Sequence, residues 1–296
     1  MRKVMALLFA LWSTGACAAV SAIDSDGRRI ILDAPAERIV SLSPHITEQL
    51  FAIGAGDKIV AASEFSDYPP EARRLPRVAS SASVNLEAVL ALRPDLVIAW
   101  RLDATAPALK RLESLGLNVF YDEPRRLHAI ADMIEALGVL TGRSANAKPL
   151  AASLRSELEG LEATYRARRP VAVFYQIADH PLMTLNGQHF VSDAIKLCGG
   201  RNVFADAPII APMVNLEAVI AADPDAIVTA RAEPADKSWQ TFWLRFPQLR
   251  AVRAGNLFAV AMNEMHRHGP RAIGATAKLC AVIDTARSKF TAAIPR

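Results

Sequence analysis

VNLEAVLALRPDLVI at residues 84–98 recurs as VNLEAVIAADPDAIV at residues 214–228, so the chain contains one internal repeat. Nine of the fifteen positions are identical, at a constant offset of 130 residues (214 − 84). Solenoid repeats have periods of about 20 to 50 residues, so this larger offset indicates two similar lobes. Each copy has Asn before a helical pattern, then Pro-Asp, then an apolar run. This order predicts a capped helix, a turn and a strand in each lobe.

Outside the repeat, short apolar runs alternate with helical patterns, which is typical of an α/β fold with central sheets. A helix is expected to begin at Pro44, because Ser43 can cap it and proline is tolerated at the first helical position. Residues 143–169 are rich in Ala, Leu, Glu, Arg and Lys, with leucines on one face, which predicts one long helix. This helix would join an N-terminal lobe at residues 19–142 to a C-terminal lobe at residues 170–296.

The N-terminus has the pattern of a secretory signal peptide. Two basic residues precede an apolar run from Val4 to Trp12, and small residues follow as far as Ala18. The run is about half of the ~20 residues that a membrane-spanning helix needs, which argues against an anchor. Cleavage before Ala19 would remove residues 1–18 and export the chain to the periplasm. A lipoprotein start at Cys17 is the alternative.

Removal of residues 1–18 leaves two cysteines, Cys198 and Cys280, in an oxidising compartment. We expect them to form a disulfide that closes a loop of 82 residues (280 − 198), with two buried free thiols as the alternative. Loss of the two N-terminal basic residues lowers the formal charge from +4 to +2. The remaining basic residues form no concentrated patch, so the sequence gives no indication of nucleic-acid binding.

Several motifs occur in a fixed order along the chain. They are RIVSLSPHITEQLFAIG at 38–54, SDYPP at 66–70, NLE at 85–87, RPDLVIAW at 93–100, LCGGRNVF at 197–204 and Pro-Arg at 270–271. In these motifs the chain resembles the cobalamin-binding branch of the helical-backbone solute receptors of ABC importers, over nearly all of its mature length. The resemblance implies two α/β lobes joined by a rigid helix, with cobalamin held in a cleft between them, and it implies neither enzymatic activity nor a cofactor.

The resemblance also implies which residues meet the ligand. A corrinoid is a flat, largely apolar macrocycle edged with amides, so it requires aromatic faces and hydrogen-bond donors. Tyr68 and Trp100 follow expected strands, where α/β folds place ligands, although core packing is the alternative for both. The other expected contacts are Ser43, Pro44 and His45 in the first lobe, and Asn263, Glu264, Met265, His266 and Arg267 in the second.

The identity of the ligand stays open at this stage. The chain has Ser81 and Ala211 where better-known members of the family have tryptophan, so two stacking platforms are absent. Haem or an iron chelate is therefore the alternative ligand. The histidines lack the spacing of a structural zinc site, and no metal site is expected. A secreted enzyme is the remaining alternative, but no G-x-S-x-G, H-E-x-x-H or Walker-type motif occurs.

Glu87 and Glu217 occupy the same position in the two repeat copies, within the first turn of each expected helix. The helix dipole favours a carboxylate there, which could account for both residues without any partner. In the family, however, the equivalent glutamates meet arginines of the two permease subunits. Matching acids on two similar lobes suit a two-fold symmetric membrane partner, so we expect a monomer that docks on a permease through them.

Overall fold

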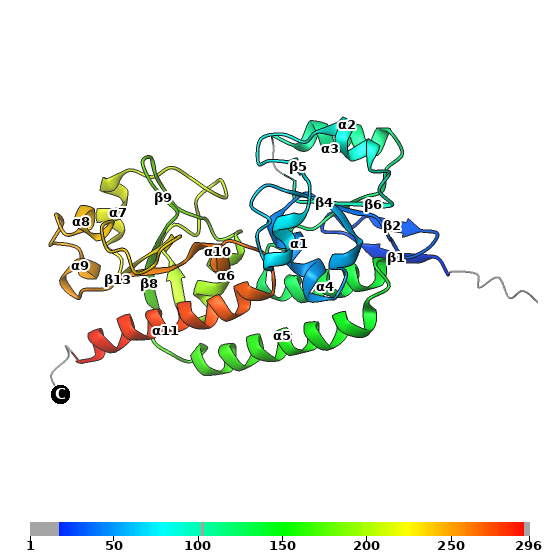
Figure 1. The fold of residues 1–296 in the computed structure, drawn as a ribbon. Helices are drawn as coiled ribbons and strands as arrows, with labels where there is room; N and C mark the ends of the chain where they lie inside the picture. Colours follow the sequence, from blue (N-terminus) through cyan, green and yellow to red (C-terminus); the bar gives the residue numbers. More distant parts are fainter. Residues whose placement is uncertain (1–17, 102–103, 293–296) are drawn as a thin grey trace, which may run out of the picture.

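Two parallel β-sheets form the framework of the protein (Figure 1). The computed structural model describes residues 18–101 and 104–292, so the expected signal peptide lies outside the described residues except for Ala18. The strand order is β5-β4-β3-β6-β7 in one sheet and β11-β8-β12-β13 in the other. All strand pairings within these two sheets are parallel. The predicted α/β class with two central sheets is therefore confirmed.

The first lobe consists of the elements from β1 to α4. Its sheet is formed by β3 (Ile39–Ser41), β4 (Ile59–Ser63), β5 (Arg77–Ala79), β6 (Leu96–Ala99) and β7 (Val119–Tyr121). The helices are α1 (Pro44–Ala52), α2 (Leu86–Ala91), α3 (Ala106–Ser114) and α4 (Leu127–Leu140). A hairpin of β1 (Val20–Ile23) and β2 (Arg29–Leu32) contacts α4.

The second lobe consists of the elements from β8 to α11. Its sheet is formed by β8 (Val171–Gln176), β11 (Gly200–Asn202), β12 (Ala226–Arg231) and β13 (Leu257–Ala261), and a short hairpin by β9 (Ala178–Asp179) and β10 (Leu182–Met183). The helices are α6 (Phe190–Leu197), α7 (Leu216–Ala222), α8 (Gln240–Trp243), α9 (Arg250–Arg253), α10 (Met262–Met265) and α11 (Pro270–Ala292).

The two repeat copies fold in the same way. The Asn85 side chain accepts a hydrogen bond from the backbone N–H of Ala88 at 3.0 Å, and Asn215 accepts one from the backbone N–H of Ala218 at 2.8 Å. After each helix, one residue has a left-handed backbone, with φ 46° at Arg93 and φ 37° at Asp223. Each copy then enters a strand, β6 or β12, which pairs with the central strand β3 or β8. The predicted order of cap, turn and strand is confirmed.

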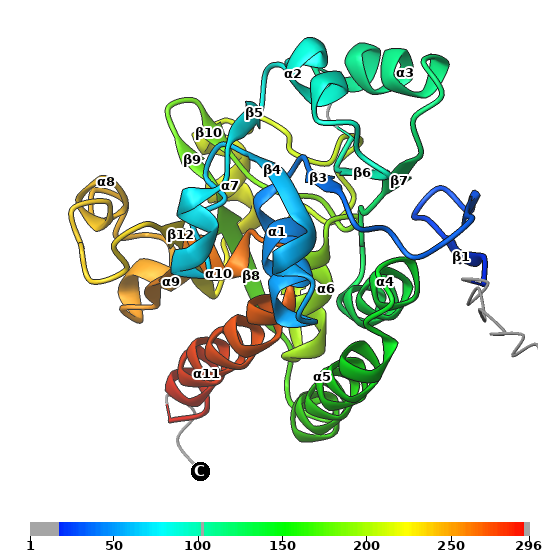
Figure 2. The same ribbon diagram turned by 45° about the vertical axis from the view of Figure 1, so that its right-hand side comes forward.

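Helix α5 (Ser144–Tyr165) connects the lobes, and α11 packs against it (Figures 1 and 2). Helix α5 lies within the segment 143–169 that was expected to be helical, and it accommodates Pro149 in its interior. A disulfide between Cys198 and Cys280 links the end of α6 to α11, as predicted. No helix in residues 18–101 or 104–292 combines the length and apolar character needed to cross a membrane.

One apolar core runs through both lobes beneath their contact. It includes Leu50 and Ile134 from the first lobe, Leu158 from α5, and Val173 and Leu279 from the second lobe, all fully buried. Separating the lobes completely would expose this shared core, which costs about 25 cal/mol per Å² of apolar surface. The lobes are therefore expected to move only to a limited extent relative to each other.

Candidate ligand-binding cleft

The carboxyl ends of the strands in the first sheet surround a pocket of about 140 Å³. Ser43 and Pro44 follow β3, Phe65 follows β4, and Trp100 follows β6; all four side chains line the pocket. Ser81, which replaces an expected aromatic platform, lines it as well. This is the edge at which open α/β sheets bind ligands. The structure thus brings together three of the expected first-lobe contacts.

The loop after β4 presents an aromatic side chain that the sequence analysis did not select. Phe65 has φ 61°, a left-handed conformation that is rare for a bulky residue, and it is 72% exposed. The backbone is held in place because Arg267 donates a hydrogen bond to the Phe65 carbonyl at 3.0 Å. Below it, the buried Ser66 hydroxyl contacts Ser63 and Thr47. Strained backbone that is fixed by its surroundings is concentrated at ligand-binding sites.

Large apolar side chains are exposed at the same end of both lobes. Tyr68 is 45% exposed beside Phe65, and Met262, directly after β13, is 37% exposed. Ile209 and Met213, in the loop after β11, are 59% and 70% exposed. These second-lobe residues were not selected from the sequence. A group of exposed apolar side chains of this kind marks a surface that another molecule covers.

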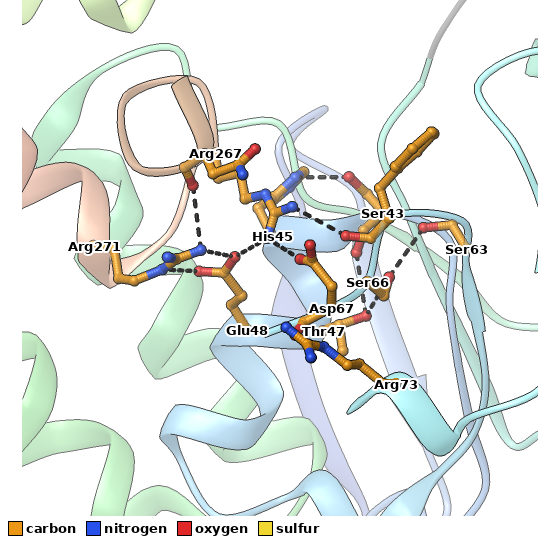
Figure 3. Close-up of polar contacts among 12 residues, drawn as sticks. Ser43, His45, Thr47, Glu48, Ser63, Ser66, Asp67, Arg73, Arg267 and Arg271 are labelled. Carbon is orange, nitrogen blue, oxygen red and sulfur yellow. Dashed lines mark hydrogen bonds and ion pairs between the residues drawn. The ribbon is translucent and has the colours of Figure 1, made fainter. Parts of the chain in front are cut away.

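Ion pairs connect the lobes at the edge of this site (Figure 3). The Arg267 guanidinium lies 2.7 Å from Glu48 and 2.8 Å from Asp67. Arg271 also donates to Glu48, and its guanidinium lies 3.9 Å from the centre of the Tyr68 ring. Burial acts to raise the pKa of Asp67, but the hydrogen bond and the charge of Arg267, together with smaller contributions from a backbone hydrogen bond and Arg73, lower that pKa overall. Arg267 and Arg271 therefore bind the second lobe to the first.

Arg267 was expected to contact the ligand directly. Its side chain is only 11% exposed, and its donors are occupied by Glu48, Asp67 and the carbonyl of Phe65. In this structure its role is to hold the loop that carries Phe65 and Tyr68. A direct contact between Arg267 and a ligand stays a prediction.

The other expected contacts of the second lobe differ in accessibility. Asn263 is exposed, and Glu264 is partly exposed and pairs with Lys278 at 2.6 Å. Met265 is fully buried, because the short helix α10 directs it into the core. In this structure the side chain supports the loop from beneath, and a contact between Met265 and a ligand stays a prediction.

Four histidines lie together where the two lobes meet. The ring of His268 is 5.3 Å from those of His45 and Trp100, and 5.6 Å from that of His189 (centroid distances). His266 contacts the Tyr175 hydroxyl at 3.1 Å. His45 and His266, both expected to meet the ligand, thus belong to this contact between lobes. Within the described residues, no group of three or more His, Cys, Asp or Glu side chains is arranged to hold a metal ion.

The expected docking residues lie on two short helices. Glu87 and Glu217 are both exposed in the first turns of α2 and α7. In both views of the fold these helices lie away from α5 and α11, one on each lobe (Figures 1 and 2). The positions leave both carboxylates accessible to a partner.

A family model described as "Periplasmic binding protein" matches residues 39–260. The chain belongs to this family. Among its relatives is a "Vitamin B12-binding protein" of Vibrio cholerae serotype O1. That periplasmic binding protein is 36% identical over 259 residues, which cover 86% of this chain and 92% of the relative.

Solved structures of periplasmic binding proteins share the fold. The crystal structure of a periplasmic vitamin B12 binding protein from Vibrio cholerae matches with a TM-score of 0.79 and 37% identity, covering 85% of this chain and 98% of that one. The apo form of a periplasmic heme-binding protein, RhuT from Roseiflexus, matches with a TM-score of 0.73 and 26% identity, covering 85% and 99%. Because the two neighbours are named for different ligands, the fold of this periplasmic binding protein does not select its ligand.

Proposed function

We propose that this protein captures cobalamin or a related corrinoid in the periplasm and delivers it to an ABC importer. The observation that carries the proposal is the 36% identity to a vitamin B12-binding protein over 86% of the chain. A cleaved signal peptide at residues 1–18 would export the chain. The protein then acts as a monomeric receptor and has no catalytic role.

The exposed apolar side chains of both lobes support a corrinoid as the ligand. Phe65 and Tyr68 on one side, and Met213 and Met262 on the other, offer apolar contacts to the two faces of a flat ring. Asn263 is exposed and carries both a donor and an acceptor, which suits the amide groups at the edge of a corrin. Together these side chains replace the tryptophan platforms that are absent at Ser81 and Ala211.

Glu87 and Glu217 would dock the loaded receptor on the permease. Both carboxylates are exposed and occupy equivalent positions on the two lobes. A two-fold symmetric permease could place one basic side chain against each of them. Such exposed ion pairs contribute orientation and specificity more than affinity.

Calorimetric titration with cyanocobalamin, cobinamide and haemin tests the choice of ligand. We expect cyanocobalamin to bind tightly. Cobinamide lacks the nucleotide loop, so its affinity shows how much of the recognition comes from the corrin ring itself. Tight binding of haemin with no binding of either corrinoid would overturn the proposal.

Haem is the second candidate, because one specific feature favours it. Tyr68 presents an exposed phenol close to the Arg271 guanidinium, and tyrosine is a known axial ligand of haem iron. If haem is the ligand, adding haemin to the protein should give a visible absorption spectrum that changes in the Tyr68→Phe variant. If cobalamin is the ligand, the same variant should keep most of its affinity, because the ring remains.

A further inference from the structure

The contact between the lobes concentrates the histidines of this chain. The sequence has six histidines, and four of them, His45, His189, His266 and His268, lie in this contact, called the lobe junction below. His45 comes from α1 of the first lobe, and the other three come from the second lobe. His128 and His180 lie elsewhere and are exposed. The proposed function makes no use of the acid–base chemistry of the four junction rings.

The hydrogen bonds at the lobe junction assign roles to the ring nitrogens of His45 and His189. His45 Nε2 lies 3.2 Å from the carbonyl oxygen of Asp122, which can only accept, so this nitrogen carries the hydrogen. His45 Nδ1 then accepts from the Ser43 hydroxyl at 2.8 Å. Likewise, His189 Nδ1 accepts from the backbone N–H of Val191 at 3.2 Å and caps α6. A second proton on His189 would occupy the acceptor nitrogen that caps α6, whereas a second proton on His45 would only reverse its bond to the Ser43 hydroxyl, which can also accept.

The walls of the lobe junction are apolar. Phe190 packs 4.3 Å from His268, and Trp100 packs 5.3 Å from it, between ring centroids. His45 and His268 are 2% and 5% exposed. Burial lowers the pKa of His45 to about 4, assisted by the nearby charge of Arg267, and lowers that of His266 to about 4. Burial and the three neighbouring histidines also lower the pKa of His268.

The lobe junction has no spare negative charge to balance an imidazolium ion. Glu48 and Asp67 are already paired with arginines, and Asp122 is uncharged at neutral pH because burial raises its pKa to about 8. The Tyr175 hydroxyl contacts His266, and burial raises the pKa of this phenol. The charged or titratable groups around the four rings are thus Glu48, Asp67, Asp122, Tyr175, Arg267 and Arg271.

We propose that the lobe junction is an acid-sensitive catch: protonation of its histidines loosens the contact between the lobes and widens the cleft, within the limited movement that the shared apolar core allows. A buried imidazolium without a counter-ion is strongly unfavourable, and the rings of His45 and His268, which are almost fully buried, gain water when the first lobe moves away from the second. Helix α5 and the disulfide-linked α11 keep each lobe folded and connected during this movement. Bound solute would be released as a consequence, but opening itself does not depend on which solute the protein binds.

The direction of the pH dependence follows from the lowered pKa values. An unperturbed histidine has a pKa near 6.5, whereas His45 and His266 have values of about 4 in the closed protein. The closed state therefore loses stability as the pH falls below 6.5; the contribution of His45 and His266 is lost by about pH 4, and that of His189 continues to be lost down to about pH 3. Asp122 acts in the opposite direction, because its raised pKa makes the closed state less stable as the pH rises toward 8. The four imidazoles outnumber this single carboxyl group.

Spin labels on the two lobes would detect the opening. Leu115 and Leu244 are exposed, one on each lobe, and can be replaced by cysteine for labelling, because Cys198 and Cys280 are buried in their disulfide. Pulsed electron paramagnetic resonance then gives the distance between the labels in ligand-free protein from neutral pH to about pH 4. We expect the distance to increase in acid while far-ultraviolet circular dichroism is unchanged. A distance that stays constant in acid would overturn the proposal. An increase in distance that is accompanied by loss of the helical signal would overturn it as well, because it would report unfolding.

Matched variants separate the lobe junction from other histidines. His268→Phe keeps an aromatic ring against Phe190 and Trp100 and removes a titrating group, and His189→Asn keeps a side-chain cap on α6. Each should move the opening to lower pH. His189→Asn alone carries the test if His268→Phe does not fold. The double variant His128→Gln/His180→Gln removes the two exposed histidines and should open like the wild type. The proposal would be refuted if this control moved the opening pH as far as the junction variants do. It would also be refuted if the junction variants left the opening pH unchanged.

Discussion

Arg267 of the second lobe forms an ion pair with Glu48 of the first lobe at 2.7 Å, and Glu48 is only 4% exposed. Arg271 binds the same carboxylate, so two arginines from the second lobe converge on one buried acid. A buried carboxylate of this kind is stable only while its cationic partners stay in place. The relative position of the lobes is therefore held by ion pairs that converge on a single carboxylate.

Replacing Glu48 with Gln should destabilise the protein. The change leaves two arginines close together without the carboxylate between them, and breaking a buried pair in this way costs about 3 kcal/mol. Urea unfolding of the two proteins measures the difference. Asp132→Asn is the control, because its pair with Arg155 is exposed and should contribute less than about 1 kcal/mol. If Glu48→Gln and Asp132→Asn lowered the free energy of unfolding equally, the buried pair between the lobes would contribute no more than an exposed pair.

Asp122→Asn should stabilise the protein, and the gain should increase with pH. The pKa of this carboxyl group is raised from 3.8 to about 8 by burial, so folding keeps it protonated while the unfolded chain ionises it. The resulting cost begins above pH 3.8 and grows until about pH 8. Asparagine avoids this cost, and its amide can donate to the unpaired Oε1 of Gln49. The free energy of unfolding of the wild type and of Asp122→Asn should be measured across this pH range. Two curves that run parallel would contradict the prediction.

The sequence predicted those features that depend on neighbouring residues. The caps at Asn85 and Asn215 need only an acceptor next to a helical run, so the repeat could be interpreted correctly. The pairing of Cys198 with Cys280 followed because removal of the leader leaves only these two. Such inferences do not require knowledge of how distant segments pack.

Contacts between the lobes could not be predicted in this way. Glu48 and Arg267 are 219 residues apart, and no local pattern links them. Arg267 was assigned to the ligand because the resemblance places the ligand-contacting loop of the family at residues 263–267. Phe65 was missed because its left-handed backbone, which sets its exposure, depends on the hydroxyl groups and the arginine that surround it.

Phe65→Ala should weaken cobalamin binding by about 1 to 3 kcal/mol, because an aromatic face at the cleft is lost. Phe65→Gly should weaken binding equally but give a more stable protein than alanine, since glycine adopts φ 61° without strain. Titration calorimetry and thermal unfolding measure the two effects. Leu115→Ala, at an exposed apolar residue outside the pocket, should leave the affinity unchanged. An unaltered affinity in both Phe65 variants would remove this residue from the site.

The last prediction concerns docking on the permease. Glu87 and Glu217 are exposed at equivalent positions of α2 and α7, so each should meet one half of a symmetric partner. An exposed ion pair contributes only about 0 to 1 kcal/mol, and removing one glutamate should therefore slow uptake only partially.

Replacing both glutamates with arginine goes further, because it places like charges against the basic sites of the permease and should abolish uptake. Affinity for the ligand should stay the same in every docking variant, since neither Glu87 nor Glu217 lines the pocket of the first lobe. Transport into proteoliposomes that contain the permease and its ATPase, measured beside calorimetry of the free receptor, separates docking from binding. Normal transport by the double charge reversal would show that other residues make the contact.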